Sequence, residues 1–169
     1  MYSQGEYVAY GMTGVCIVEG LTEMAIPGTK DMKSYYVLKP VYEEKGVIYC
    51  PVSNENNMRR VLTREEAEEL LASTDNLPMH DISAKKTLDE ACKNSIATGL
   101  CKEYMIVLKT LVMERNGRIA TGKKLTATNE RFLKICMDKL CGELAIAYGT
   151  DRKEIEDMVK AVLDKAQGA

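Results

Sequence analysis

The sequence predicts an α+β protein in which a small N-terminal β-barrel is followed by a C-terminal all-α helical bundle. Two observations lead to this prediction. Residues 1–62 contain short β-branched and aromatic runs between glycine-bearing turns, a pattern typical of a small closed or half-open barrel. From Thr63 onward, apolar residues recur at helical spacing. The length of 169 residues fits one medium domain or two small ones.

The first 62 residues predict five strands in sequence. The first is followed at once by a turn with glycines at positions 11 and 14, and later turns contain Gly28 and Gly46. The expected strands cover residues 7–10, 15–18, 35–39, 47–52 and 58–62. So small a β-domain buries a modest share of its surface.

A short helix and a linker are expected next, over residues 63–80. Thr63 and Glu66 have the spacing of a capping box ahead of an apolar stripe. The helix is acidic on its outer face, and it ends near Ser73 before a break that contains Pro78. We place the boundary between two domains in this break.

Four further helices are expected in residues 81–169. Ser83 is a candidate cap for the first, and Thr126 for the long helix that runs to about residue 148. The second helix is expected over about residues 100–115, closed by Gly117, and the third is stopped by Gly149. The last helix starts at Thr150 or Asp151.

The cysteines and the single histidine predict no metal site and no cofactor. No Cys-x-x-Cys pair is present, and a zinc site needs about four clustered ligands. We expect the six cysteines to be reduced and buried in the core. No stretch approaches the roughly 20 apolar residues that span a bilayer, and residues 1–6 lack the features of a signal peptide. A cytoplasmic protein is expected.

Basic residues are concentrated in the C-terminal half, although the whole chain carries a net charge of −2. Residues 81–169 have 16 Lys and Arg against 13 Asp and Glu, a net charge of +3. Arg115, Arg118, Lys123 and Lys124 are expected between two helices, and clustered cations of this kind neutralise phosphates. The alternative is an ordinary solvated surface.

An enzymatic function has little support in the sequence. There is no Ser-His-Asp or Cys-His set and no glycine-rich phosphate loop. We expect the acidic residues of the short helix to form a solvent-exposed face and not a catalytic site. A binding function is better supported, because the strand at residues 47–52 is a candidate exposed edge with Tyr49 as an aromatic anchor. The alternative is a strand paired on both sides within its own barrel.

Several motifs resemble those of the CarD family of bacterial transcription regulators, whose N-terminal domain is shared with transcription-repair coupling factor. Residues 5–10 resemble the family's opening "GD-x-V-V-Y", residues 35–38 its "YY-x-L" strand, and residues 50–52 its "V-P" strand. In the helical half, residues 125–133 resemble "L-S-x-x-E-x-R-x-L" and residues 141–145 resemble "x-x-E-L-A". Their order and spacing extend over some 140 residues.

The resemblance implies a Tudor/SH3-like barrel at residues 1–62 that pairs a strand with the β subunit of RNA polymerase. It also implies a helical domain at residues 81–169 that meets promoter DNA at the upstream edge of the melted bubble and stabilises the open complex, without chemistry of its own. The polymerase-binding positions implied here are Val37, Lys39, Val47, Tyr49 and Cys50.

The DNA-binding candidates come from the resemblance and from the basic residues together. They are Ile82, Lys85, Lys86, Lys123, Lys124, Arg131 and Lys134. Many family members begin the bundle with a tryptophan that wedges into the minor groove, and this chain has no tryptophan. Lys85 takes that position, or Ile82 if the alignment has a gap, and an apolar side chain can also wedge between bases.

Two other functions remain open. One is a protein-interaction module that binds polymerase or another partner without DNA. The other is a thiol-dependent enzyme. We expect no membrane and no small-molecule substrate.

Overall fold

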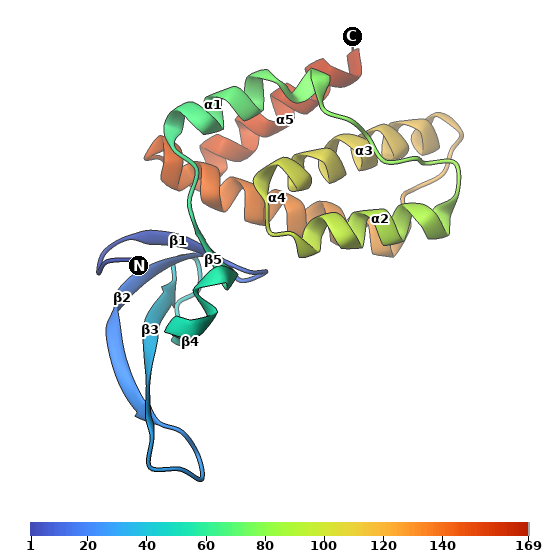
Figure 1. Ribbon diagram of the computed structural model, residues 1–169. Coiled ribbons are helices and arrows are strands. Elements are labelled where there is room, and N and C mark those ends of the chain that lie inside the picture. The colour runs from blue at the N-terminus through green and yellow to red at the C-terminus, as the bar shows by residue number, and fades with distance from the viewer. Residues whose placement is uncertain (169) are drawn as a thin grey trace. The chain divides into compact units, whose positions relative to one another are not determined.

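The computed structural model describes residues 1–168 and divides the chain into two compact units, residues 1–61 and 62–169. Each unit has its own hydrophobic core. The N-terminal unit is a sheet and the C-terminal unit is helical, so the predicted α+β class is confirmed (Figure 1). None of the helices in the described part is long and apolar enough to cross a membrane.

The N-terminal unit is a five-stranded antiparallel sheet. Its strands are β1 (Tyr7–Tyr10), β2 (Gly14–Ala25), β3 (Met32–Pro40), β4 (Ile48–Pro51) and β5 (Met58–Arg60). They lie in the order β4-β3-β2-β1-β5. All five predicted strands are present, but β2 is longer than expected because it continues with β3 into a hairpin arm, which is visible in Figure 1.

The expected barrel is not closed, because the sheet is open, with β4 and β5 as its two edges. Between these edge strands the chain forms a 3-10 helix, η1 (Val52–Asn57), instead of a hairpin. One face of the sheet carries a small core of seven buried side chains: Val8, Cys16, Val18, Tyr36, Leu38, Cys50 and Met58.

The hydroxyl of Tyr36 is satisfied within this core. It donates to Oε2 of Glu55 at 3.0 Å and accepts from the backbone N–H of Tyr2 at 3.2 Å. The ring of Tyr2 packs edge-on against the ring of Tyr36, with 6.1 Å between centroids. Burial is the main reason that the pKa of Tyr36 lies above its usual value.

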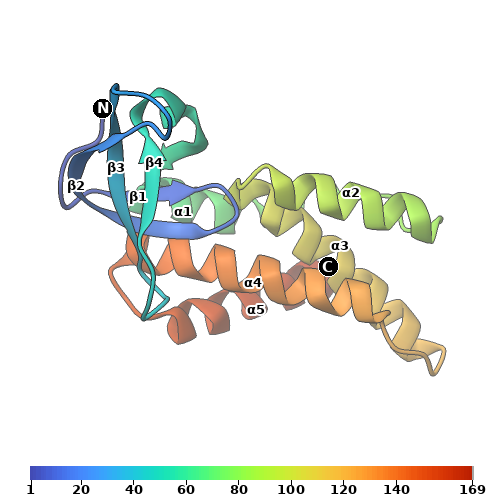
Figure 2. The ribbon, with the colours of Figure 1, turned by 90° about the horizontal axis from the view of Figure 1, so that it is seen from below.

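The helical unit contains five α-helices around one core. They are α1 (Arg64–Ala72), α2 (Lys85–Ala97), α3 (Cys101–Ala120), α4 (Ala127–Tyr148) and α5 (Arg152–Gly168). Helix α4 packs against the other four, and Figure 2 shows α5 running beside it. A short 3-10 helix, η2 (Thr74–Asn76), follows α1. Helix α1 supplies three side chains to this core and belongs to the helical unit, whereas it was predicted as part of the linker segment 63–80.

Three of the predicted helix starts follow capping chemistry. Thr63 and Glu66 form the expected capping box of α1. Thr126 Oγ1 accepts from the backbone N–H of Asn129 at 3.2 Å, as expected for α4. Asp151 Oδ1 accepts from the backbone N–H of Glu154 at 2.9 Å, which identifies the start of α5. Gly149 ends α4 in the left-handed region, with φ of 69°.

Two predicted boundaries are wrong. Helix α3 does not end at Gly117 but continues to Ala120. A glycine inside a helix costs only about 1 kcal/mol relative to alanine, and the ion pair between Arg118 and Glu114 at 2.7 Å supports this last part of the helix. Ser83 does not cap α2, whose N-cap is Ala84 without any side-chain hydrogen bond.

Candidate functional site

Strand β4 is an edge of the sheet and presents one exposed aromatic ring. It pairs with β3 alone, so no other strand of the described chain covers its outer side. Tyr49 is 49% exposed and stands opposite Val37 of β3. Unpaired backbone groups along such an edge can accept a strand from another protein.

Strand geometry and burial separate Cys50 from the other four polymerase-binding candidates. Val37, Lys39 and Tyr49 share the outer face of the sheet, because side chains alternate along a strand and Val37 pairs with Tyr49. Val47 is 48% exposed and directly precedes β4. Cys50 lies on the opposite face and is fully buried in the core. Its backbone belongs to the edge strand, but its side chain is not on the surface.

The outer face continues across two more strands, β1 and β2, with residues that were not among the predicted site residues. Tyr7 of β1 pairs with Ile17 of β2, and Ile17 pairs with Lys39 of β3. Tyr7 is 40% exposed. Alternation along β1 shows which residues share a face with Tyr7 within that strand. Only the order of the strands shows that Lys39 of β3 lies on the same face of the sheet.

The basic candidates of the helical unit fall in three separate places. The first is a groove of about 560 Å³ between α2 and α4, here called the α2/α4 groove. It brings together Lys85, Lys86 and Arg131. Lys93 of α2 also lines it, at helical spacing from Lys86, and was not among the candidates. The remaining lining residues are Asp89, Glu90, Thr128 and Phe132.

The α2/α4 groove is chemically suited to an anion. Four cationic side chains line it against two carboxylates, a local excess of two positive charges. No side chain caps the N-terminus of α2 at Ala84. The first N–H groups of a helix carry partial positive charge and bind anions when no cap occupies them. Ile82 is 39% exposed and lies three residues ahead of this helix.

The remaining basic candidates are not in the α2/α4 groove. Lys123 and Lys124 are exposed in the connection between α3 and α4, where Arg118 Nη1 donates to the Lys124 carbonyl at 3.3 Å. Lys134 lines a different groove, of about 510 Å³, whose other charged residues include Arg115 and Asp164. Arg115 and Arg118 lie within α3 instead of the predicted loop.

The cysteines are poor nucleophiles in the folded protein. All six are free and buried, as expected from the sequence. Burial raises the pKa of Cys92 to about 11 and that of Cys141 to about 12, and it also raises the pKa of Cys136. Within the described residues, no group of three or more His, Cys, Asp and Glu side chains could hold a metal ion.

His80 takes part in a polar chain that sequence reasoning missed. Its Nε2 lies 2.8 Å from Ser95 Oγ, and Ser95 donates to Oε2 of Glu103 at 2.8 Å. The backbone N–H of His80 donates to Thr110 Oγ1 at 3.0 Å. In a hydrolase triad the imidazole lies between the serine and the carboxylate. Here the buried serine lies between them and donates a hydrogen bond to Glu103, so the order of the three groups differs from that of a triad.

The N-terminal unit is thus an open antiparallel sheet whose edge strand β4 pairs with β3 alone and carries an exposed tyrosine. Residues 2–62 match the family model of the CarD-like/TRCF RID domain, so this unit is a CarD-like RNA polymerase-interacting domain. The match covers residues 2–62 of the 169 and supports a transcription-related protein that interacts with RNA polymerase through this unit. No curated protein matches the chain in a sequence comparison.

Proposed function

We propose that this protein is a bacterial, cytoplasmic regulator of transcription initiation. In this proposal the N-terminal unit, an open Tudor-like sheet, binds the RNA polymerase β subunit. The helical unit contacts promoter DNA at the upstream edge of the bubble and stabilises the open complex. The protein performs no chemistry of its own.

The uncovered edge of β4 with the exposed ring of Tyr49 is the observation that supports the polymerase contact most directly. Main-chain pairing at such an edge provides affinity, and side chains beside it provide specificity. Tyrosine is enriched among the residues that dominate binding energy in interfaces. A partner strand on β4 would meet Tyr49 on the outer face of the sheet.

Binding of the full-length protein to the isolated polymerase β lobe tests this contact. Tyr49→Glu introduces a charge beside the edge and is expected to weaken binding by at least about tenfold, the effect of losing an interfacial aromatic anchor. Met12→Glu introduces the same charge at a 56% exposed position in the β1–β2 turn and serves as the matched control. Equal binding by wild type and Tyr49→Glu would contradict the proposed edge contact.

The α2/α4 groove supports the DNA contact. Each cation placed against a phosphate releases a condensed counterion, so even a local excess of two positive charges contributes to affinity. Tethering by the N-terminal unit raises the effective concentration of DNA near the helical unit. Weak intrinsic DNA affinity is then sufficient.

A protein-interaction module without DNA contact is the second candidate function, favoured by the acidic total charge and the absence of tryptophan. Reversing Lys123 and Lys124 to Glu, and separately Lys85 and Lys86, distinguishes the two functions. Shortened open-complex lifetimes support the DNA contact. Unchanged lifetimes for both double variants, with polymerase binding intact, leave the interaction module as the function.

A further inference from the structure

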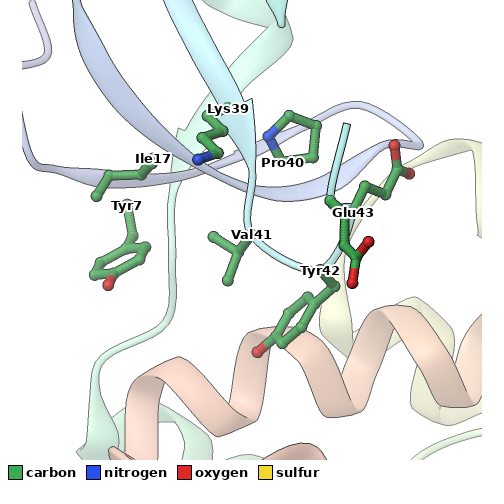
Figure 3. Close-up of a pocket in the computed structure, with 8 residues that line it drawn as sticks. Tyr7, Ile17, Lys39, Pro40, Val41, Tyr42 and Glu43 are labelled. Atoms are coloured by element: carbon green, nitrogen blue, oxygen red, sulfur yellow. The ribbon is translucent and has the colours of Figure 1, made fainter. Parts of the chain in front are cut away.

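A pocket on the outer face of the N-terminal sheet lies between two tyrosines. It measures about 500 Å³. Its lining residues are Tyr7, Ile17, Lys39, Pro40, Val41, Tyr42, Glu43 and Glu44. In Figure 3 the rings of Tyr7 and Tyr42 extend to the same side of the sheet, with Val41 between them. This tyrosine pocket is large enough for a long side chain.

We propose that the tyrosine pocket binds a lysine or arginine side chain presented by the polymerase β subunit. The identity of the partner rests on the proposed function, whereas the preference for a basic side chain rests on the pocket. The aliphatic part of such a side chain would lie against Ile17 and Val41. Lysine and arginine commonly bury their methylene stems in this way while the charged end stays at the surface.

The two rings favour a positive charge at the open end of the pocket. Tyr7 and Tyr42 both line the pocket and are 40% and 38% exposed. A cation over the face of a tyrosine is attracted by the negative potential of the ring. A neutral aliphatic side chain would gain contact with the pocket but not this attraction.

The net charge of the residues that line the pocket also favours a cationic ligand. Two carboxylates, Glu43 and Glu44, face one ammonium, that of Lys39, which leaves one negative charge in excess. Neither carboxylate forms an ion pair with another part of the described chain. An incoming cation would therefore meet carboxylates that are not already neutralised, while an anion would be repelled.

The tyrosine pocket and the β4 edge are parts of one surface. Lys39 lines the pocket and is two residues from Val37 on β3, and Val37 stands opposite Tyr49. These three side chains share the outer face of the sheet. A partner that pairs with β4 can thus reach the pocket with a neighbouring segment.

Two small probes test the pocket without any partner protein. N-acetyl-lysine methylamide and its uncharged analogue N-acetyl-norleucine methylamide are titrated into the full chain, with the tyrosine ring resonances as readout. We expect the lysine probe alone to shift Tyr7 and Tyr42. Replacing both Glu43 and Glu44 by Gln is expected to weaken its binding by about fivefold, because the variant removes both carboxylates that attract the ammonium. Lys39→Met is expected to strengthen binding. Glu23→Gln, an exposed position on β2, is the control.

The probe titrations and the binding assay distinguish failure of the pocket proposal from failure of the proposed function. Three results would contradict the proposal that the tyrosine pocket prefers a basic side chain. They are equal binding of both probes, no binding of the lysine probe, and no effect of the double glutamine variant. The partner assignment is tested with the isolated β lobe, whose binding the double glutamine variant should weaken and make less dependent on salt. If wild type binds the lobe and the double variant binds equally well, the assignment to polymerase is wrong. If wild type does not bind the lobe but the lysine probe binds, the proposed function fails and the pocket stands.

Discussion

The buried carboxylate of Glu143 accepts a hydrogen bond from the backbone N–H of Leu62 at 2.9 Å, across 81 positions of the chain. Glu143 lies in α4 and is only 3% exposed. Leu62 is the first residue of the helical unit. The hydrogen bond therefore fixes the point at which the chain enters that unit, just ahead of the capping box of α1.

Glu143→Leu is expected to lower the free energy of unfolding by about 1–3 kcal/mol, because it leaves the Leu62 N–H without its acceptor. Glu143→Gln keeps an oxygen at the same place and should cost less. Urea unfolding followed by far-UV circular dichroism measures both. Equal stability of wild type and Glu143→Leu would show that this hydrogen bond does not hold the chain.

Lys109 is buried in α3, and its ammonium donates to three backbone carbonyls, those of Thr74, Asp75 and Leu77, at 2.8–3.0 Å. Lys109→Met should destabilise the protein by about 1.5–3 kcal/mol, the range for hydrogen bonds to a charged group. Hydrogen exchange should accelerate around residues 74–77. The same substitution at Lys102, exposed on the same helix, should stay within about 0.5 kcal/mol of wild type.

DNA affinity should depend on the α2/α4 groove and on salt. If Lys85 and Lys86 each neutralise one phosphate, reversing both to Glu should reduce the slope of log affinity against log salt concentration by about 2. Fluorescence anisotropy with a forked promoter duplex measures this slope. Reversing Lys153 and Lys165, which are exposed on α5, makes the same change in net charge and should leave most of the slope unchanged. The same loss from both pairs would mean that only total charge matters.

Alkaline pH should destabilise the fold through the buried thiols. Because the folded pKa values of Cys92 and Cys141 are raised to about 11 and about 12, the unfolded state loses these protons first as pH rises. Their contribution is complete below about pH 8.5 and is lost as pH rises toward these folded values, by at most about 1.4 kcal/mol per pH unit for each group.

Comparison with an alanine variant isolates this effect. The difference in unfolding free energy between wild type and Cys92→Ala, measured at pH 8 and pH 10, should change with pH. Iodoacetamide should react slowly with the folded protein and rapidly in urea. Rapid modification of one cysteine in the folded state would revive the thiol-enzyme alternative.

Local patterns in the sequence were sufficient to predict much of the fold. Alternating and β-branched runs predicted all five strands, and the Thr63–Glu66 and Thr126 caps were predicted because their chemistry is confined to one helical turn. The predicted end of α3 at Gly117 was wrong, because tertiary packing can override the low helix propensity of a glycine. Closure of a sheet depends on pairing between distant strands, so the sequence could not show that the barrel is open.

The candidate sites were predictable residue by residue but not as groups. Exposed lysines are recognisable from sequence, yet only the packing of α2 on α4 shows that Lys85 and Arg131 share a groove that excludes Lys134. The same holds for Tyr7 and Lys39, which come together through strand order alone. The acceptors of the Lys109 ammonium are backbone carbonyls. Every residue has a backbone carbonyl, so the sequence does not indicate which ones accept these hydrogen bonds.

The shortness of β4 has a consequence for self-association. An uncovered strand can recruit copies of its own protein, and long flat edges are the ones that seed aggregates. Here the edge covers only Ile48–Pro51, and its last residue has no N–H to offer a neighbouring strand. Such an edge can hold one short visiting segment but is poorly suited to an extending ladder. The shortness of this edge and its final proline therefore disfavour edge-to-edge growth of a sheet through β4.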